Sequence, residues 1–148
     1  MLSNADALDS LFGSKSNARG VFSQCLCHRY RYMMEASTGK VICEQNADER
    51  RSPASITKIM TALIALENAD LKKVVTIPSA AAGVEGSSIY IKAGEKYSLE
   101  DLLYGLMLRS GNDAAVAIAE HVSGSVPAFV EKMNARAQVL NADAHFVN

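Results

Sequence analysis

Apolar residues recur every three or four positions along four stretches of the chain, which is the spacing of one face of an α-helix. The predicted helices cover 56–66, 99–109, 113–122 and a segment that begins at Pro127. The first of these is apolar around most of its circumference, so we expect it to lie inside a domain. The last should bury one face, formed by Phe129, Val130, Met133, Ala137 and Leu140.

β-Strand signals are shorter and begin before the first helix. Apolar and polar residues alternate up to a Ser37-Thr38-Gly39 turn signal and a short apolar run follows it, so 30–45 is predicted to form a β-hairpin. Two further β-prone pieces are 71–77 and 88–92. The pattern thus places one hairpin ahead of a mainly helical region.

Residues 1–28 differ from the rest of the chain in composition. They are rich in Ser, Asn, Ala and Gly without sustained periodicity, so we expect a leader or a loosely attached arm, followed by a partial domain over 29–148. The N-terminus lacks the basic start and apolar stretch of a signal peptide, and no apolar run reaches the roughly 18 residues of a membrane-spanning helix. The chain is therefore expected to be cytoplasmic or to have lost an export signal.

The charge balance argues against one large class of function. The 148 residues carry 15 basic and 16 acidic side chains, a formal net charge of -1, which disfavours a protein that binds nucleic acid by neutralising phosphates. Hydrophobic residues make up 49% of the chain and charged residues 21%, the reverse of a disordered chain. A folded domain that does not bind nucleic acid is therefore expected.

The cysteines support neither a disulfide framework nor a metal site. Three cysteines, Cys25, Cys27 and Cys43, cannot all pair. Cys25, Cys27 and His28 resemble half of a zinc site, but no second ligand pair follows at a useful spacing. We therefore expect no metal.

The candidate chemistry lies at the start of the first helix, in Ser55-Ile56-Thr57-Lys58. Residues at i and i+3 share one helical face, so Lys58 is expected to reach the Ser55 hydroxyl. A serine becomes nucleophilic when a base takes its proton, and a lysine is such a base only when its pKa falls from about 10.4. Burial and the positive end of the helix dipole lower that pKa, and the same helix end offers the Ser55 N–H to an oxyanion. The alternative is an ordinary helix start with an exposed Lys58.

A second group of polar residues, Ser110-Gly111-Asn112, interrupts two predicted helices without a proline. Ser110 and Asn112 are spaced to point into one cleft, where the hydroxyl passes a proton and the amide holds a peptide by its donor and acceptor. The alternative is a glycine C-cap followed by an asparagine N-cap. Ser37-Thr38-Gly39-Lys40 repeats the Ser-x-x-Lys spacing, but there we expect an exposed turn with a charged, inert lysine.

Long runs around these motifs resemble the serine-type D-alanyl-D-alanine carboxypeptidases, which are low-molecular-mass penicillin-binding proteins. The runs are Ser52–Leu63 and Leu102–Ala115, and 35–41 and 145–148 resemble flanking segments of the same family. The resemblance covers about residues 32–148. It implies an α/β fold of the transpeptidase/β-lactamase-like type, here a helical lobe with an incomplete antiparallel sheet.

The resemblance also implies a role for each candidate residue. Ser55 would attack the penultimate D-Ala carbonyl of a peptidoglycan stem peptide, the terminal D-Ala would leave, and water would hydrolyse the acyl-enzyme. Lys58 would be the acylation base, Ser110 would relay a proton to the leaving amine, and Asn112 would bind the substrate peptide. β-Lactam antibiotics would acylate Ser55 as inhibitors. The family acts in the extracytoplasmic cell envelope, and no metal or organic cofactor is implied.

The sequence departs from the family pattern in three ways. The third motif, Lys-Thr-Gly, is absent, and Lys92-Ala93-Gly94 is no substitute because it precedes the second motif. Residues 1–30 do not match the family's export signal and lead-in, and the chain stops where the remaining sheet strands would begin. We therefore expect an N-terminal portion of a catalytic domain that is inactive by itself. The alternatives are a class A β-lactamase-like hydrolase, which carries Ser-Asp-Asn as its second motif, and a non-catalytic penicillin-binding-fold module.

Overall fold

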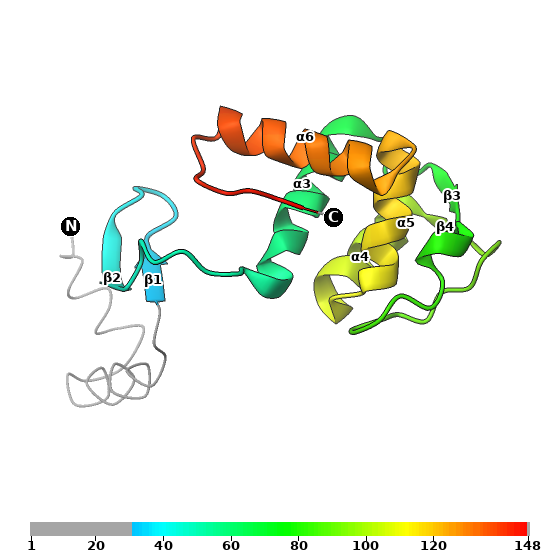
Figure 1. Cartoon of the computed structure of the whole chain (residues 1–148), viewed down its shortest axis with the longest axis horizontal. Helices are drawn as coiled ribbons and strands as arrows, with labels where there is room; N and C mark the ends of the chain where they lie inside the picture. Colours follow the sequence, from blue (N-terminus) through cyan, green and yellow to red (C-terminus); the bar gives the residue numbers. More distant parts are fainter. Residues whose placement is uncertain (1–30, 148) are drawn as a thin grey trace. The chain divides into compact units, whose positions relative to one another are not determined.

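The computed structural model describes residues 31–147, and the chain divides into two compact units, 1–51 and 52–148 (Figure 1). In the first unit, strands β1 (Arg31–Met34) and β2 (Val41–Gln45) pair antiparallel, which confirms the predicted hairpin. Gly39 lies in the turn at a φ of +69°, a conformation that glycine adopts without strain. The predicted arm over 1–28 lies outside the described residues.

The second unit is a bundle of helices with one short two-stranded sheet (Figure 1). A 3₁₀ turn, η1 (Ala54–Ile56), leads into helix α3 (Thr57–Asn68). Strand β3 (Val74–Thr76) and a second 3₁₀ turn, η2 (Ser79–Ala81), precede strand β4 (Lys96–Ser98). Three helices then follow closely on one another: α4 (Leu99–Arg109), α5 (Asn112–Ser123) and α6 (Val126–Val139).

The helix ends follow local sequence signals. Ser98 caps α4 by accepting a hydrogen bond from the Asp101 N–H at 3.0 Å, and Ser125 caps α6 in the same way. Gly124 ends α5 at a φ of +77°, in the left-handed region that favours glycine. The four predicted helices are confirmed, with small shifts at their ends.

Helix α5 lies at the centre of the second unit and packs against α3, α4 and α6. Its small side chains Ala114 and Ala117 are fully buried, which lets the neighbouring helices approach closely. Two apolar clusters result. The larger one joins α5 to α3, α4 and the β3–β4 region, and the smaller one consists of Ile64, Ala119, Phe129 and Met133.

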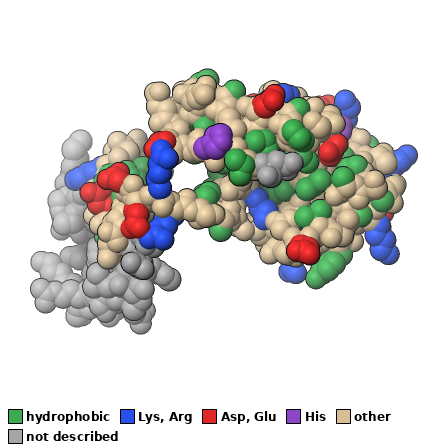
Figure 2. All heavy atoms as spheres, viewed as in Figure 1, with side chains coloured by type: hydrophobic (Ala, Val, Ile, Leu, Met, Phe, Trp, Pro, Cys, Tyr) green, Lys and Arg blue, Asp and Glu red, His purple; other side chains and the backbone are tan. Residues whose placement is uncertain are grey.

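Helix α3 buries only one face, so the expectation that it is surrounded by protein is wrong for this unit. Ile56, Ile59 and Leu66 are 67%, 57% and 55% exposed, whereas Ile64 and Ala65 are buried. The exposed residues form one stripe at helical spacing, on the side of α3 that no residue of 52–147 covers. Apolar side chains accordingly reach the surface of the helical unit (Figure 2). Leu140, which was predicted to lie on the buried face of the last helix, is 48% exposed and lies just beyond the end of α6.

The predicted strand at 88–92 does not form. The N–H groups of Ile89 and Ile91 donate to the Asp113 carboxylate instead of to a neighbouring strand, and Tyr90 has a φ of +61°, which is incompatible with a strand. The sequence pattern also missed β4, which pairs antiparallel with β3. The β-prone piece at 71–77 is confirmed only as the three residues of β3.

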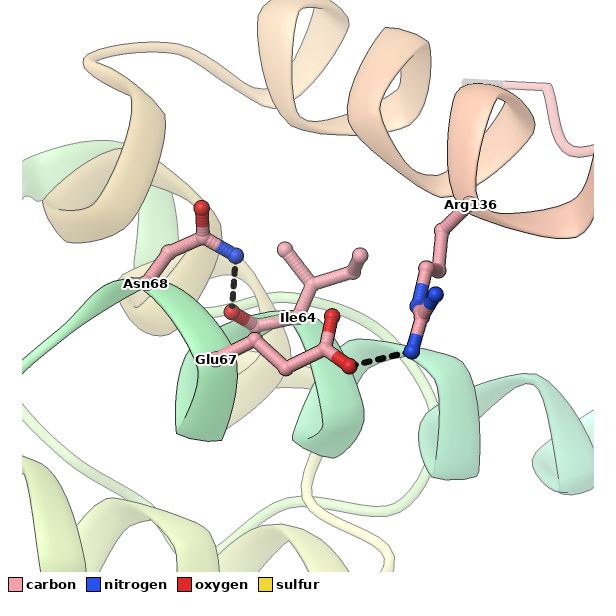
Figure 3. Close-up of polar contacts among 4 residues, drawn as sticks. All are labelled: Ile64, Glu67, Asn68 and Arg136. Carbon is pink, nitrogen blue, oxygen red and sulfur yellow. Dashed lines mark hydrogen bonds and ion pairs between the residues drawn. The ribbon is translucent and has the colours of Figure 1, made fainter. Parts of the chain in front are cut away.

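Polar contacts tie α6 to its surroundings. Arg136 on α6 pairs with Glu67 on α3, and on α3 itself Asn68 donates to the Ile64 carbonyl at 2.8 Å (Figure 3). Asn134 holds the segment after α6, because its amide donates to the Phe146 carbonyl at 2.9 Å and accepts from the Phe146 N–H at 2.8 Å. Phe146 then packs against the smaller apolar cluster.

Replacing Asn134 with Ala is expected to lower the free energy of unfolding by about 1–3 kcal/mol, because two hydrogen bonds to the Phe146 backbone are lost together. Urea unfolding measures this loss. Gln138→Ala, at an exposed position on the same helix, is the matched control and should change stability little. Equal stabilities of the two variants would show that the two Asn134–Phe146 hydrogen bonds contribute nothing to the free energy of unfolding.

Candidate active site

The candidate nucleophile lies in a tight turn at the start of α3. Ser55 belongs to η1, directly before the helix, and is exposed. Ala54 precedes it at a φ of +48°, a left-handed conformation that is unusual for a residue with a side chain. Such local strain is typical of positions where the surrounding structure fixes a functional side chain.

Lys58 lies one turn further along and points toward the loop between α4 and α5. Its Nζ donates to Ser110 Oγ at 3.0 Å and to Asn112 Oδ1 at 2.6 Å. The side chain is half-buried, and this burial lowers the pKa of Lys58 from its ordinary value of 10.5. A larger fraction of the amine is therefore neutral at a given pH than in a free lysine.

Ser110 bridges the lysine and the candidate nucleophile. It ends α4 at a φ of +56°, and its Oγ donates to Ser55 Oγ at 2.9 Å while it accepts from Lys58. Helical spacing predicts that Lys58 reaches the Ser55 hydroxyl, but the hydrogen bonds of Lys58 go to Ser110 and Asn112 instead. The hydroxyl of Ser110 occupies the position between them, so Lys58 connects to Ser55 through a chain of two hydrogen bonds.

Asn112 completes the group of four. It is the first residue of α5, where Gly111 is the N-cap residue and has no side chain to cap with, so the capping alternative does not describe Asn112. Its Oδ1 accepts from Lys58, and its Nδ2 donates to the Glu85 carbonyl at 2.7 Å. The structure therefore brings all four candidate residues, Ser55, Lys58, Ser110 and Asn112, into one hydrogen-bonded group.

Asp113 is a residue of this region that the sequence pattern did not single out. It is 1% exposed, and its carboxylate accepts hydrogen bonds from the Ser88 hydroxyl and from the N–H groups of Ile89, Ile91 and Ala114. Burial alone raises the pKa of Asp113, but the hydrogen bonds together outweigh it and leave the pKa below its ordinary value. The available signal was an acidic residue at the start of an otherwise apolar helix.

Comparisons with known proteins show the family of the chain. The sequence model of the D-alanyl-D-alanine carboxypeptidase family matches residues 28–148. The chain belongs to this family. D-Alanyl-D-alanine carboxypeptidase DacF of Bacillus subtilis is 43% identical over 113 residues, which are 73% of this chain and 29% of DacF.

Solved structures show the same family fold, which confirms the predicted transpeptidase-like class. The crystal structure of D-alanyl-D-alanine carboxypeptidase DacD from Francisella tularensis is 38% identical with a TM-score of 0.78, over 82% of this chain and 31% of that one. Penicillin binding protein 5 from Haemophilus influenzae is 33% identical with a TM-score of 0.74, over 81% and 38% of the two chains. The chain thus spans about a third of the relatives that it matches.

The second Ser-x-x-Lys segment, Ser37 to Lys40, lies in a different environment from Ser55 and Lys58. Ser37 and Lys40 are exposed in the turn between β1 and β2, where Thr38 donates to Glu35. Lys92-Ala93-Gly94 likewise lies in an exposed turn, before β4. Lys92-Ala93-Gly94 shares no hydrogen bond with the four candidate residues, and the Lys92 N–H donates to Glu95 instead.

Metal-binding side chains do not cluster among residues 31–147, where no group of three or more His, Cys, Asp or Glu residues could hold an ion. Cys43 is a half-buried free thiol on β2, and Cys25, Cys27 and His28 lie outside the described residues. Within the same residues, no helix combines the length and apolar character that a membrane crossing requires.

Gly86→Ala is expected to displace the Asn112 side chain. A Cβ at Gly86 would lie 2.7 Å from Asn112 Nδ2, and the φ of +93° already disfavours a side chain. Gly83→Ala is the matched control, because Gly83 has a similar φ of +78° and nothing within 4 Å of the added atom. We expect Gly86→Ala to lower the unfolding free energy by about 1–3 kcal/mol more than Gly83→Ala, as for other overpacked sites. Equal losses in denaturant unfolding would contradict the close contact.

Proposed function

We propose that this chain is the N-terminal part of the catalytic domain of a serine-type D-Ala-D-Ala carboxypeptidase, with Ser55 as the nucleophile. The observation that carries the proposal is the chain of hydrogen bonds from Ser55 through Ser110 to Lys58, with a lysine pKa that burial lowers. A nucleophile, a relay and a base in contact are the parts that acyl transfer to serine requires.

In the acylation step, Ser55 Oγ attacks the carbonyl carbon of the penultimate D-Ala of a peptidoglycan stem peptide. The Ser55 proton passes to Ser110 while the Ser110 proton passes to the neutral Lys58 amine, since both hydroxyls rotate to donate in that direction. The peptide C–N bond then breaks, and the terminal D-Ala leaves after Ser110 returns a proton to its amine. Water hydrolyses the ester on Ser55 and restores the hydroxyl.

Two further groups contribute to this step. The Ser55 N–H, in the turn η1 that leads into α3, would donate to the oxyanion that forms on the attacked carbonyl. Asn112 binds the backbone of the stem peptide, and its carbonyl oxygen also holds the Lys58 side chain in place. No metal or organic cofactor takes part in the proposed reaction.

The proposed reaction also requires an oxyanion donor that in the family comes with Lys-Thr-Gly, which does not occur in these 148 residues. Loss of one such donor slows catalysis by about 100- to 1,000-fold. We therefore expect the chain by itself to be inactive, and a full-length chain that also carries Lys-Thr-Gly to acylate Ser55.

Substrates and location follow from the same proposal. One structural relative is named a penicillin binding protein, and we propose that β-lactams inhibit this protein by acylating Ser55, as mimics of D-Ala-D-Ala. Because stem peptides belong to peptidoglycan, we propose an extracytoplasmic place of action in the cell envelope.

Release of D-alanine from a synthetic stem peptide ending in D-Ala-D-Ala tests the proposal, with the full-length extended chain as the enzyme. We expect D-alanine release and a penicilloyl-enzyme that persists after free penicillin is removed. Rapid turnover of the penicilloyl-enzyme without D-alanine release would favour the β-lactamase-like alternative. Absence of both D-alanine release and a covalent adduct would favour a non-catalytic module.

A further inference from the structure

We propose that Asp113 is a positioning residue for this site, because it anchors the 85–91 loop on α5 and thereby fixes which end of the Asn112 amide faces Lys58. The proposal rests on the proposed function for its catalytic consequence. Its structural part, the orientation of Asn112, stands independently of any reaction.

The hydrogen-bond partners around Asp113 suit only a carboxylate. Every partner of its two oxygens is a donor: the Ser88 hydroxyl at 2.6 Å, the N–H groups of Ile89 at 3.1 Å and Ile91 at 3.2 Å, and its neighbour Ala114 N–H at 2.9 Å. A carboxylate has acceptors alone, whereas an amide of the same shape would set its own N–H₂ against these donors. Since the site is buried, water does not replace the missing bonds.

The same loop carries the groups that hold Asn112. The Ser87 carbonyl accepts from the Asn112 backbone N–H at 2.7 Å, and the Glu85 carbonyl accepts from the Asn112 side chain at 2.7 Å. Asp113 binds the loop directly after these two residues. Release of Ser88, Ile89 and Ile91 would therefore free the Glu85 carbonyl from its place beside Asn112.

The Asn112 amide connects the loop to Lys58. A carbonyl oxygen pairs only with the Nδ2 end of an asparagine amide, so Glu85 directs the Oδ1 end toward Lys58, where it accepts at 2.6 Å. Without Glu85 in place, the amide is free to turn and present N–H groups to the Lys58 amine, which is itself a donor. Lys58 would then lose one of the two oxygens that keep it beside Ser110.

Asp113→Asn in the full 148-residue chain tests the orientation directly. In the unmodified chain we expect slow hydrogen exchange at the Asn112 side-chain amide by NMR, because that amide is bonded to Glu85, and we expect Asp113→Asn to abolish this protection. Phe129→Leu is the control, since Phe129 is buried in the separate smaller cluster. This substitution should lower the stability of the chain without changing any contact of the loop. If Asp113→Asn prevents folding, Ser88→Ala removes one hydrogen bond to Asp113, together with the one that Ser88 accepts from the Tyr90 N–H, and should reduce the protection partially. Protection that survives Ser88→Ala and Asp113→Asn alike would overturn the proposal.

The catalytic consequence is measured as the rate constant for Ser55 acylation by a fluorescent penicillin in the full-length extended chain. We expect Asp113→Asn to lower it by about 10- to 100-fold, because a small misplacement of a catalytic group costs up to about 100-fold in rate. Phe129→Leu should leave it unchanged. An unmodified protein that never acylates would refute the proposed function, whereas an acylation rate constant unaffected by Asp113→Asn would refute the positioning role alone.

Discussion

Lys58→Ala is expected to slow acylation of Ser55 by a penicillin about 100- to 10,000-fold, which is the range that a general base contributes. The physical reason is the loss of the group that finally accepts the Ser55 proton through Ser110. The rate constant is measured by stopped-flow or gel labelling with a fluorescent penicillin in a chain extended past Asn148 to full length.

The pH dependence of the same rate constant gives a second signature. Only the neutral amine accepts a proton, so acylation should rise with pH and level off above the Lys58 pKa, which burial places below 10.5. Lys58→Ala should lose this rise. Lys40→Ala, in the exposed turn that repeats the Ser-x-x-Lys spacing, is the matched control and should retain both the rate and the pH profile. A pH-independent rate in the unmodified protein would contradict the assignment of Lys58 as base.

Ser110→Ala is expected to reduce acylation by a similar factor of about 100- to 10,000-fold, because it removes the bridge between Ser55 and Lys58. Residues that act as one unit are strongly non-additive, so the double variant with Lys58→Ala should be little slower than either single variant. Ser123→Ala is the matched control, since the buried Ser123 hydroxyl has no hydrogen-bond partner in the described structure. A double variant whose loss is the product of the single losses would indicate that Ser110 and Lys58 act independently.

The helices and the four candidate residues could be predicted because their signals are local. Helical periodicity, capping serines and Gly124 lie within or beside the elements that they define, and each motif of the candidate site spans only a few residues. The family resemblance rests on the same short-range information. What these signals establish is which residues share a face or a loop.

The features that could not be predicted depend on contacts between distant parts of the sequence. The direction of the Lys58 side chain is set by two oxygen acceptors, Ser110 Oγ and Asn112 Oδ1, which lie more than fifty residues away in the sequence. The spacing between Lys58 and Ser55 therefore did not predict these partners. Residues 88–91 do not form a strand, because the N–H groups of Ile89 and Ile91 donate to the Asp113 carboxylate. The exposure of Ile56, Ile59 and Leu66 likewise depends on which elements pack against α3, and helical periodicity carries no information about that.

The most direct test of the central claim, an acyl-enzyme on Ser55, is the location of the penicillin adduct. The extended full-length protein is treated with penicillin, digested and analysed by mass spectrometry, with Ser55→Ala as control. The account predicts a penicilloyl group on the peptide that contains Ser55 and none in the Ser55→Ala protein. An adduct on another residue, such as Ser37, or a folded protein that carries no adduct at all, would contradict it.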